Sequence, residues 1–216
     1  MKKISTILFD FDGTLSDTMA LNFKSWQKAF SKYNVEIRED DYYPLEGMQL
    51  KKIAKLISER YKVNTSEEEI IKAKEIFFKT NYKFSTYEGV EELISLLKIN
   101  NVKIAIVSGA NIERLNNTVP KEFLDKFDLI ITEDKLSFGK PHPEPYLLAM
   151  QTLGSKADGT IVIENAPLGI KSAKSANCFC IAICSTLSEE YLKEADIIVK
   201  EFKEIKNLEL IRRLAI

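Results

Sequence analysis

Short apolar runs, rich in β-branched residues and bounded by polar ones, recur along the 216-residue chain. Between several of them lie longer stretches in which apolar residues return every three or four positions, the spacing of amphipathic helices. Strands that alternate with helices favour a parallel sheet covered by helices on both faces. The pattern therefore predicts an α/β protein with a Rossmann-like core. The expected strands lie near residues 5–9, 103–107, 128–132, 160–164, 180–184 and 196–199.

The segment 18–84 departs from this alternation, because its pattern is helical throughout. Its first helix carries an aromatic stripe that includes Trp26 and Phe30, and we expect this stripe to form the core of a small helical bundle. A later helix begins at Ser66, with Glu69 placed three residues on to complete a capping box. The predicted organisation is a core of residues 1–17 and 85–216 with a helical insertion of residues 18–84.

Two carboxylates follow the first predicted strand, in the sequence Asp10-Phe11-Asp12-Gly13-Thr14. The chain must turn at Gly13, so both carboxylates can be presented at the carboxyl end of the strand, where open α/β sheets bind ligands. Crowded acids repel each other unless a cation lies between them, and Mg²⁺ prefers such hard oxygen ligands. The motif predicts a metal-assisted site, although acidic residues are also ordinary in loops after strands.

Polar residues also stand at the ends of two further predicted strands, and in a loop beyond a third. Ser108 and Gly109 could hold a phosphate oxygen, or Ser108 could simply cap the next helix. Lys140 precedes a stiff proline-rich segment and could neutralise charge, although most lysines are solvated surface residues. Glu164 and Asn165 could offer oxygen ligands to a cation, or they could simply form a capped turn.

Together these motifs resemble those of the haloacid dehalogenase superfamily, specifically its phosphatase and β-phosphoglucomutase-like branch with a helical cap. The matching stretches are DFDGT, VSG, the lysine of GKPHPEP, and ENAPLG, which occur in this order between residues 10 and 169. None is specific alone, but the set is. The resemblance implies that the segment 18–84 is a mobile cap that closes over the site.

The resemblance also implies catalytic roles. Asp10 would attack phosphorus to form an aspartyl-phosphate, and Asp12 would act as general acid and base. Thr14 would orient Asp12 and the phosphate. Ser108 with the amide of Gly109 would bind phosphoryl oxygens. The charge of Asp10 and the phosphate would be balanced by Lys140.

The cofactor implied by the resemblance is Mg²⁺. It would be held by the Asp10 carboxylate, the Asp12 backbone carbonyl, and the pair Glu164 and Asn165. Many relatives carry a second acid where this chain has Asn165. The amide keeps an oxygen ligand but removes one negative charge, which should weaken Mg²⁺ binding.

The proposed substrate is a small phosphate monoester, with a sugar or polyol phosphate as the expected class. Mutases of this branch carry an arginine where this chain has Leu50 and a histidine where it has Asn22, which argues against a phosphomutase. The candidate substrate contacts are Glu46, Gly47, Lys51, Lys52 and Asn111.

Alternative functions stay open at this point. A β-phosphoglucomutase-like sugar phosphomutase is the first, and a non-catalytic protein that binds phosphate esters is the second. Dehalogenation is disfavoured because that branch lacks an acid at the position of Asp12. A phosphorylatable signalling module is disfavoured by the insertion 18–84, which such short domains lack.

Composition agrees with a small-molecule enzyme. With 31 basic and 32 acidic residues the net charge is −1, which gives no polycation for nucleic acid. We find no apolar run of membrane-spanning length and no secretory signal, so we expect a cytoplasmic enzyme that is a monomer or weak homodimer. Cys178, Cys180 and Cys184 are expected to be reduced residues of a buried strand, and His142 an ordinary loop residue.

Overall fold

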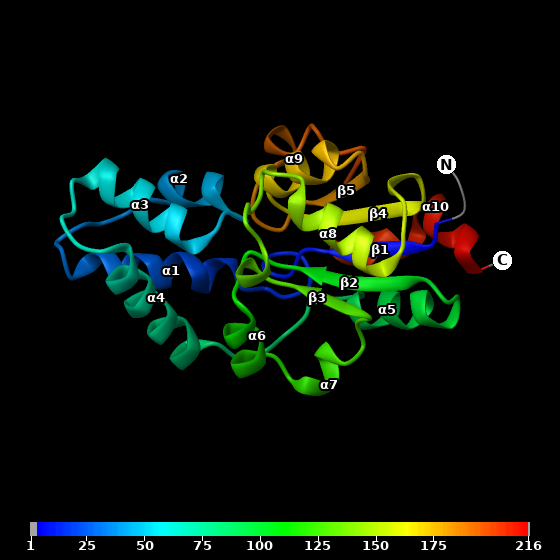
Figure 1. Cartoon of the computed structure of the whole chain (residues 1–216), viewed down its shortest axis with the longest axis horizontal. Coiled ribbons are helices and arrows are strands. Elements are labelled where there is room, and N and C mark those ends of the chain that lie inside the picture. Colours follow the sequence, from blue (N-terminus) through cyan, green and yellow to red (C-terminus); the bar gives the residue numbers. More distant parts are fainter. Residues whose placement is uncertain (1–3, 216) are drawn as a thin grey trace.

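The computed structural model describes residues 4–215, and its centre is a six-stranded parallel sheet of order β3-β2-β1-β4-β5-β6 (Figure 1). In register, Phe9 lies between Ile106 and Ile163, so the three central strands end at the same edge. The predicted strands are confirmed, with ends that differ by at most one residue. Their bounds are β1 Thr6–Phe9, β2 Lys103–Val107, β3 Leu129–Ile131, β4 Thr160–Glu164, β5 Phe179–Ile183 and β6 Ile197–Val199.

Helices cover both faces of the sheet, as the alternating pattern predicts. Side chains alternate along β1, so Ile7 and Phe9 join one apolar cluster while Leu8 joins the other. In Figure 1 α8 and α9 lie above the sheet and α5 below it. The helices of the core are α5 Val90–Ile99, α6 Ile112–Thr118, α7 Lys121–Leu124, α8 Glu144–Leu153, α9 Pro167–Ser175 and α10 Glu209–Arg212.

A helical unit is inserted between β1 and α5 and lies beyond one end of the sheet (Figure 1). Its apolar cluster is separate from the two clusters of the sheet and includes the fully buried Trp26 and Phe30, as the aromatic stripe predicts. Its helices are α1 Met19–Ser31, α2 Glu39–Tyr42, α3 Leu50–Tyr61 and α4 Glu67–Asn81. Short 3₁₀ turns span Tyr43–Leu45, Glu133–Lys135, Ala157–Gly159, Glu189–Tyr191, Phe202–Asn207 and Arg213–Ala215.

The start of α4 agrees only in part with the predicted capping box. The Ser66 hydroxyl accepts a hydrogen bond from the Glu69 backbone N–H at 3.3 Å, as expected of an N-cap. The Glu69 carboxylate, however, accepts a hydrogen bond from the Thr65 hydroxyl at 2.5 Å. The Glu69 carboxylate is therefore bound by Thr65 and does not complete the capping box with the backbone N–H of Ser66.

The cysteines are free thiols, as predicted. Cys180 lies within β5 and Cys178 just before it, and both are buried in the cluster that α8 and α9 cover, while Cys184 follows the strand and is partly exposed. Across residues 4–215, the helices are all too short or too polar to cross a membrane.

Candidate functional site

A buried lysine joins two strand ends of the sheet. The Lys140 ammonium donates hydrogen bonds of 2.6 Å to both Asp10 and Glu164, and one of 3.1 Å to the Val107 carbonyl. Asp10 follows β1 and Glu164 ends β4, the adjacent strand, so the parallel register brings the two carboxylates together. Lys140 is 2% exposed and is thus the buried charge that its proline-rich loop predicts.

Electrostatics in this cluster are strongly perturbed. Burial raises the pKa of Asp10 to about 7, since desolvation and the nearby Glu164 outweigh the attraction of Lys140. Burial opposes the charge of Lys140 as well, but the two carboxylates raise its pKa above the usual value. Tyr146 on α8 donates a 2.7 Å hydrogen bond to Glu164 and so holds this carboxylate in place.

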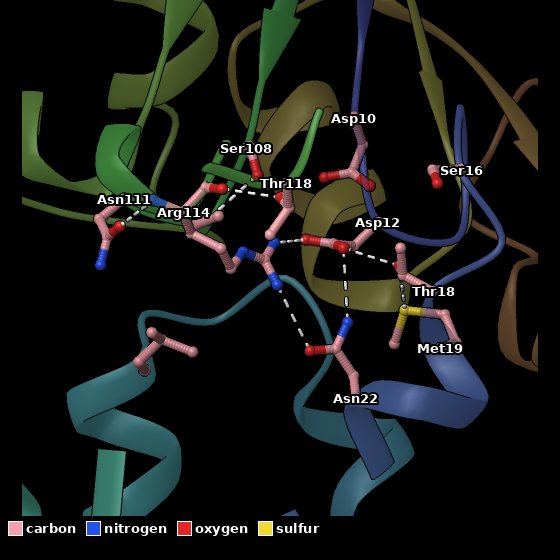
Figure 2. Close-up of polar contacts among 12 residues, drawn as sticks. Asp10, Asp12, Ser16, Thr18, Met19, Asn22, Ser108, Asn111, Arg114 and Thr118 are labelled. Carbon is pink, nitrogen blue, oxygen red and sulfur yellow. Dashed lines mark hydrogen bonds and ion pairs between the residues drawn. The ribbon is translucent and has the colours of Figure 1, made fainter. Parts of the chain in front are cut away.

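Asp12 has different partners. One of its oxygens pairs with the Arg114 guanidinium, and the other accepts hydrogen bonds from the Thr18 hydroxyl at 2.7 Å and from Asn22 at 3.4 Å (Figure 2). Burial raises the pKa of Asp12, but Arg114 and Thr18 outweigh it, so the net shift is downward. The two aspartates are therefore held in distinct environments although one residue separates them.

The turn that follows the two aspartates requires glycine. Gly13 has φ +82°, and a Cβ there would lie 2.2 Å from the Asn165 amide nitrogen. The Thr14 hydroxyl, predicted to orient Asp12, instead donates to the Asn165 carbonyl oxygen at 3.2 Å, and Thr18 takes the contact with Asp12. The Thr14 side chain therefore contacts the residue that follows β4 and not the neighbouring Asp12.

Glu46, a residue of the inserted unit, lies in this site. It follows the Tyr43–Leu45 turn, is 2% exposed, and accepts a 3.3 Å hydrogen bond from the Asn165 amide. Its other oxygen, Oε1, is buried and has no hydrogen-bond partner in the structure. Burial, followed by repulsion from Asp10 and Glu164, raises the pKa of Glu46 to about 9.

Ser108 and Gly109, two of the predicted phosphate-binding residues, follow β2 and lie close to the inserted unit. Ser108 is buried. The Ser108 hydroxyl oxygen accepts a 3.0 Å hydrogen bond from the Ala110 N–H, which leaves its proton free to donate. A Cβ at Gly109 would lie 3.0 Å from the Gly47 carbonyl oxygen, so the backbones of the two units nearly touch there. A partly open cavity of about 40 Å³ lies between them. Its lining includes Asp10, Asp12, Gly109 and Arg114 from the core, and Asn22, Trp26, Tyr42, Gly47 and Met48 from the inserted unit.

Four of the five predicted substrate contacts, Glu46 among them, do not line this cavity. Lys51 is 68% exposed and pairs with Glu68 at 2.7 Å, and Lys52 is also exposed. Asn111 caps α6, where its side chain accepts a 2.8 Å hydrogen bond from the Arg114 N–H. Glu46 and Gly47 do lie at the site. The roles of all five stay predictions.

Sequence reasoning missed Arg114 altogether. Its partner Asp12 lies 102 positions earlier, so no local pattern joins the two. The available signal was its position three residues after Asn111, one turn into the helix that follows the Ser108 motif. A long cation placed there can reach back toward the end of β1.

The donor set fits a Mg²⁺ ion, which this superfamily is expected to use. Asp10 and Asn165 offer oxygens at adjacent strand ends, and the unpartnered Oε1 of Glu46 adds negative charge beside them. Both Glu164 oxygens are already engaged, by Lys140, Tyr146 and the backbone N–H groups of Asn165 and Ala166. Within residues 4–215 no three acid, histidine or cysteine side chains are gathered as a metal cluster. Mg²⁺ commonly takes only one or two carboxylates, with water and substrate oxygens completing its shell.

Comparison with known proteins agrees with this arrangement. The chain is 30% identical to the pyrophosphatase PpaX of Oceanobacillus iheyensis over 94% of its own length and 95% of that protein. It is 31% identical to the chloroplastic protein SUPPRESSOR OF QUENCHING 1 of Arabidopsis thaliana over 89% of its own length, but spans only 19% of that longer protein. The solved β-phosphoglucomutase of Clostridium difficile superposes with a TM-score of 0.83 at 29% identity, covering 98% of this chain and 96% of that one.

The sequence model of the haloacid dehalogenase-like hydrolases matches residues 7–183, which contain all four motifs and the inserted helices. The predicted family and fold class are confirmed, and the predicted enzyme class, a hydrolase acting on phosphate esters, agrees with the phosphatase relatives. The chain belongs to the haloacid dehalogenase-like hydrolases.

Proposed function

We propose that the protein is a Mg²⁺-dependent phosphatase that hydrolyses a small phosphate monoester through a phosphorylated Asp10. The observation that carries the proposal is the buried contact of Lys140 with Asp10 and Glu164, beside a second, separately held aspartate. A sugar or polyol phosphate is the expected substrate class. The similarity to a β-phosphoglucomutase structure supports that class.

The first half of the reaction uses Asp10 as the nucleophile. Lys140 holds its Oδ1, which leaves the other carboxylate oxygen to attack phosphorus. The Ser108 hydroxyl can donate to a phosphoryl oxygen, and the Lys140 ammonium offsets the charge that gathers on the phosphoryl group. Asp12 would take up a proton from solvent when substrate binds, give it to the leaving oxygen, and then remove one from the water that attacks the phosphorylated Asp10.

A bound Mg²⁺ would supply positive charge between the phosphate and the Asp10 carboxylate, with Asn165 as the other side-chain ligand and the Asp12 carbonyl as the backbone ligand. Glu164 fixes Lys140, Tyr146 and the first turn of α9 around this point. The donors are thus placed before substrate arrives, so little reorganisation is needed during transfer.

We also propose that residues 18–84 act as a cap on a core of residues 1–17 and 85–216. The loop with Glu46 and Gly47 covers the strand ends, and the partly open cavity between the two units has a volume of about 40 Å³. A phosphate ester needs more space than this. The unit must therefore move aside to admit substrate and close again to exclude bulk water.

The test is phosphate release from phosphorylated sugars, polyols, nucleotides, pyrophosphate and an aryl phosphate, with and without Mg²⁺. Asp10→Asn is the blank, and Asp17→Asn is the matched control because Asp17 lies exposed in the same loop. Release that chelator and Asp10→Asn abolish, and Asp17→Asn preserves, supports the proposal. Interconversion of hexose phosphates without net release would indicate a mutase, and binding without turnover would indicate a non-catalytic protein. Either result refutes the proposal.

A further inference from the structure

A buried cation lies where α6 of the core meets the inserted unit. Arg114 is 3% exposed, and its guanidinium lies 4.8 Å from the centre of the Phe78 ring on α4. One terminal nitrogen donates to Asn22 at 3.4 Å, and the other pairs with Asp12 (Figure 2). The Nε atom is buried and has no hydrogen-bond partner in the structure. The site thus holds a desolvated cation with an unused donor.

Two carboxylates favour the charge of this cation, first Asp12 and then Glu75. Lys74 on α4 is fully buried, and its ammonium donates a 2.8 Å hydrogen bond to Glu75. Glu133 is mostly buried and accepts a hydrogen bond from the Leu50 N–H. Among residues 4–215 the acid in ion-pair contact with Arg114 is Asp12.

Asp12 cannot serve Arg114 and a leaving group at the same time. Both of its oxygens are engaged on the side of α1 and α6, one by Arg114 and the other by Thr18 and Asn22 (Figure 2). To reach the leaving oxygen of a phosphate on Asp10, the Asp12 side chain must turn and break the ion pair. A buried guanidinium left without an anion is strongly destabilised.

We propose that Arg114 binds a second negative charge on the leaving group, and that this charge releases Asp12 for proton transfer. The inference rests on the proposed function. Arg114 borders the same cavity as Asp10, so an anionic group bound there would lie close to the leaving oxygen. The substrate class is a small phosphate ester whose leaving group carries a carboxylate or a second phosphate.

The test compares two substrates of similar size, 2-phosphoglycolate and 2-hydroxyethyl phosphate, which differ in a carboxylate against a hydroxymethyl group. We expect the wild type to favour the carboxylate by about 10- to 100-fold in kcat/KM, the usual worth of a hydrogen bond to a charged group. Arg114→Gln should bring that ratio close to one. Arg213→Gln, at a side chain that is 72% exposed, should leave the ratio unchanged.

A role of Arg114 limited to positioning Asp12 gives a different result. In that case Arg114→Gln slows both substrates by the same factor, and the inference is wrong. Arg114→Lys keeps the charge and serves if the Gln variant does not fold, as judged by thermal unfolding. A single ammonium contact should replace a paired one, so the ratio should fall by about tenfold. An unchanged ratio in a folded Lys variant also overturns the inference.

Binding separates this inference from the proposed function. Calorimetric titration of both compounds into the Asp10→Asn protein measures the preference without turnover. A carboxylate preference that Arg114→Gln removes, in a protein whose wild type releases no phosphate, supports the anion site and refutes the phosphatase. Phosphate release with no preference in binding or rate supports the phosphatase and refutes the anion site.

Discussion

Replacing Glu46 with Gln should stabilise the metal-free protein, and by an amount that depends on pH. Glu46 is 2% exposed, one of its oxygens is unpartnered, and burial raises its pKa from 4.5 to about 9. The unfolded chain releases this proton near pH 4.5, whereas the folded chain keeps it until about pH 9. The contribution of Glu46 to stability is therefore full below pH 4.5 and is lost as pH rises through that window.

The size of the effect follows from the same pKa. Each pH unit above 4.5 removes about 1.4 kcal/mol, so the loss reaches roughly 3 kcal/mol at pH 7. Gln cannot ionise, yet its side-chain oxygen can still accept the hydrogen bond from the Asn165 amide. Glu46→Gln should thus match the wild type near pH 4.5 and exceed its stability by about 3 kcal/mol at pH 7. That gain is large beside the 5–15 kcal/mol that typically separates folded from unfolded domains.

Urea unfolding between pH 4.5 and 8, in the presence of chelator, measures this difference directly. Asp10 titrates in the same direction and is present in both proteins, so the difference between them reports Glu46 together with its repulsion from Asp10. Glu36→Gln, at an exposed acid of the same inserted unit, is the control and should show no such trend. A stability difference for Glu46→Gln that is independent of pH would refute the reasoning.

Other substitutions test the remaining contacts of the site. Lys140→Met leaves two buried carboxylates without their cation, so urea unfolding should show a loss of about 3–5 kcal/mol; a loss below about 1 kcal/mol would contradict the geometry. Asp12→Asn removes the proposed acid and base and should slow phosphate release by about 10²–10⁴-fold, and an unchanged rate would exclude that role. Asn165→Asp adds a charge at the proposed metal site and should tighten Mg²⁺ binding in calorimetric titration, whereas weaker binding would mean that its side chain is not a ligand.

The strand ends of this site could be predicted from sequence because their signals are local. Apolar runs that stop at Asp10, Ser108 and Glu164 identify three parallel strands. Parallel register then brings the residues after Phe9, Val107 and Ile163 to one edge. Lys140 was found because the stiff loop around it carries its own signal, and burial on three acceptors matches that interpretation.

The contacts between residues far apart in the sequence had no such signal. Glu46 meets Asn165 across 119 positions, and Arg114 meets Asp12 across 102. The first pair depends on how far the helical unit closes on the sheet, and the second on how α6 packs against the loop after β1. No short-range pattern encodes either arrangement. The contact of Thr14 with Asn165 had no local signal either, because Asn165 follows β4 and becomes a neighbour only when the sheet forms.

The central position of β1 has a consequence for how the chain folds during synthesis. Thr6 pairs with Lys103 on one side and with Thr160 on the other. The pairing of β1 is therefore complete only after both β2 and β4 have been synthesised. Ribosomes add about 5–20 residues per second, and long-range strand pairing is intrinsically slow. The inserted helices make their apolar contacts among residues 19–73 and can collapse first. The nascent chain should therefore pass through a stage in which the helical unit is compact while the β1 strand stays unpaired, open to a chaperone that binds extended apolar segments.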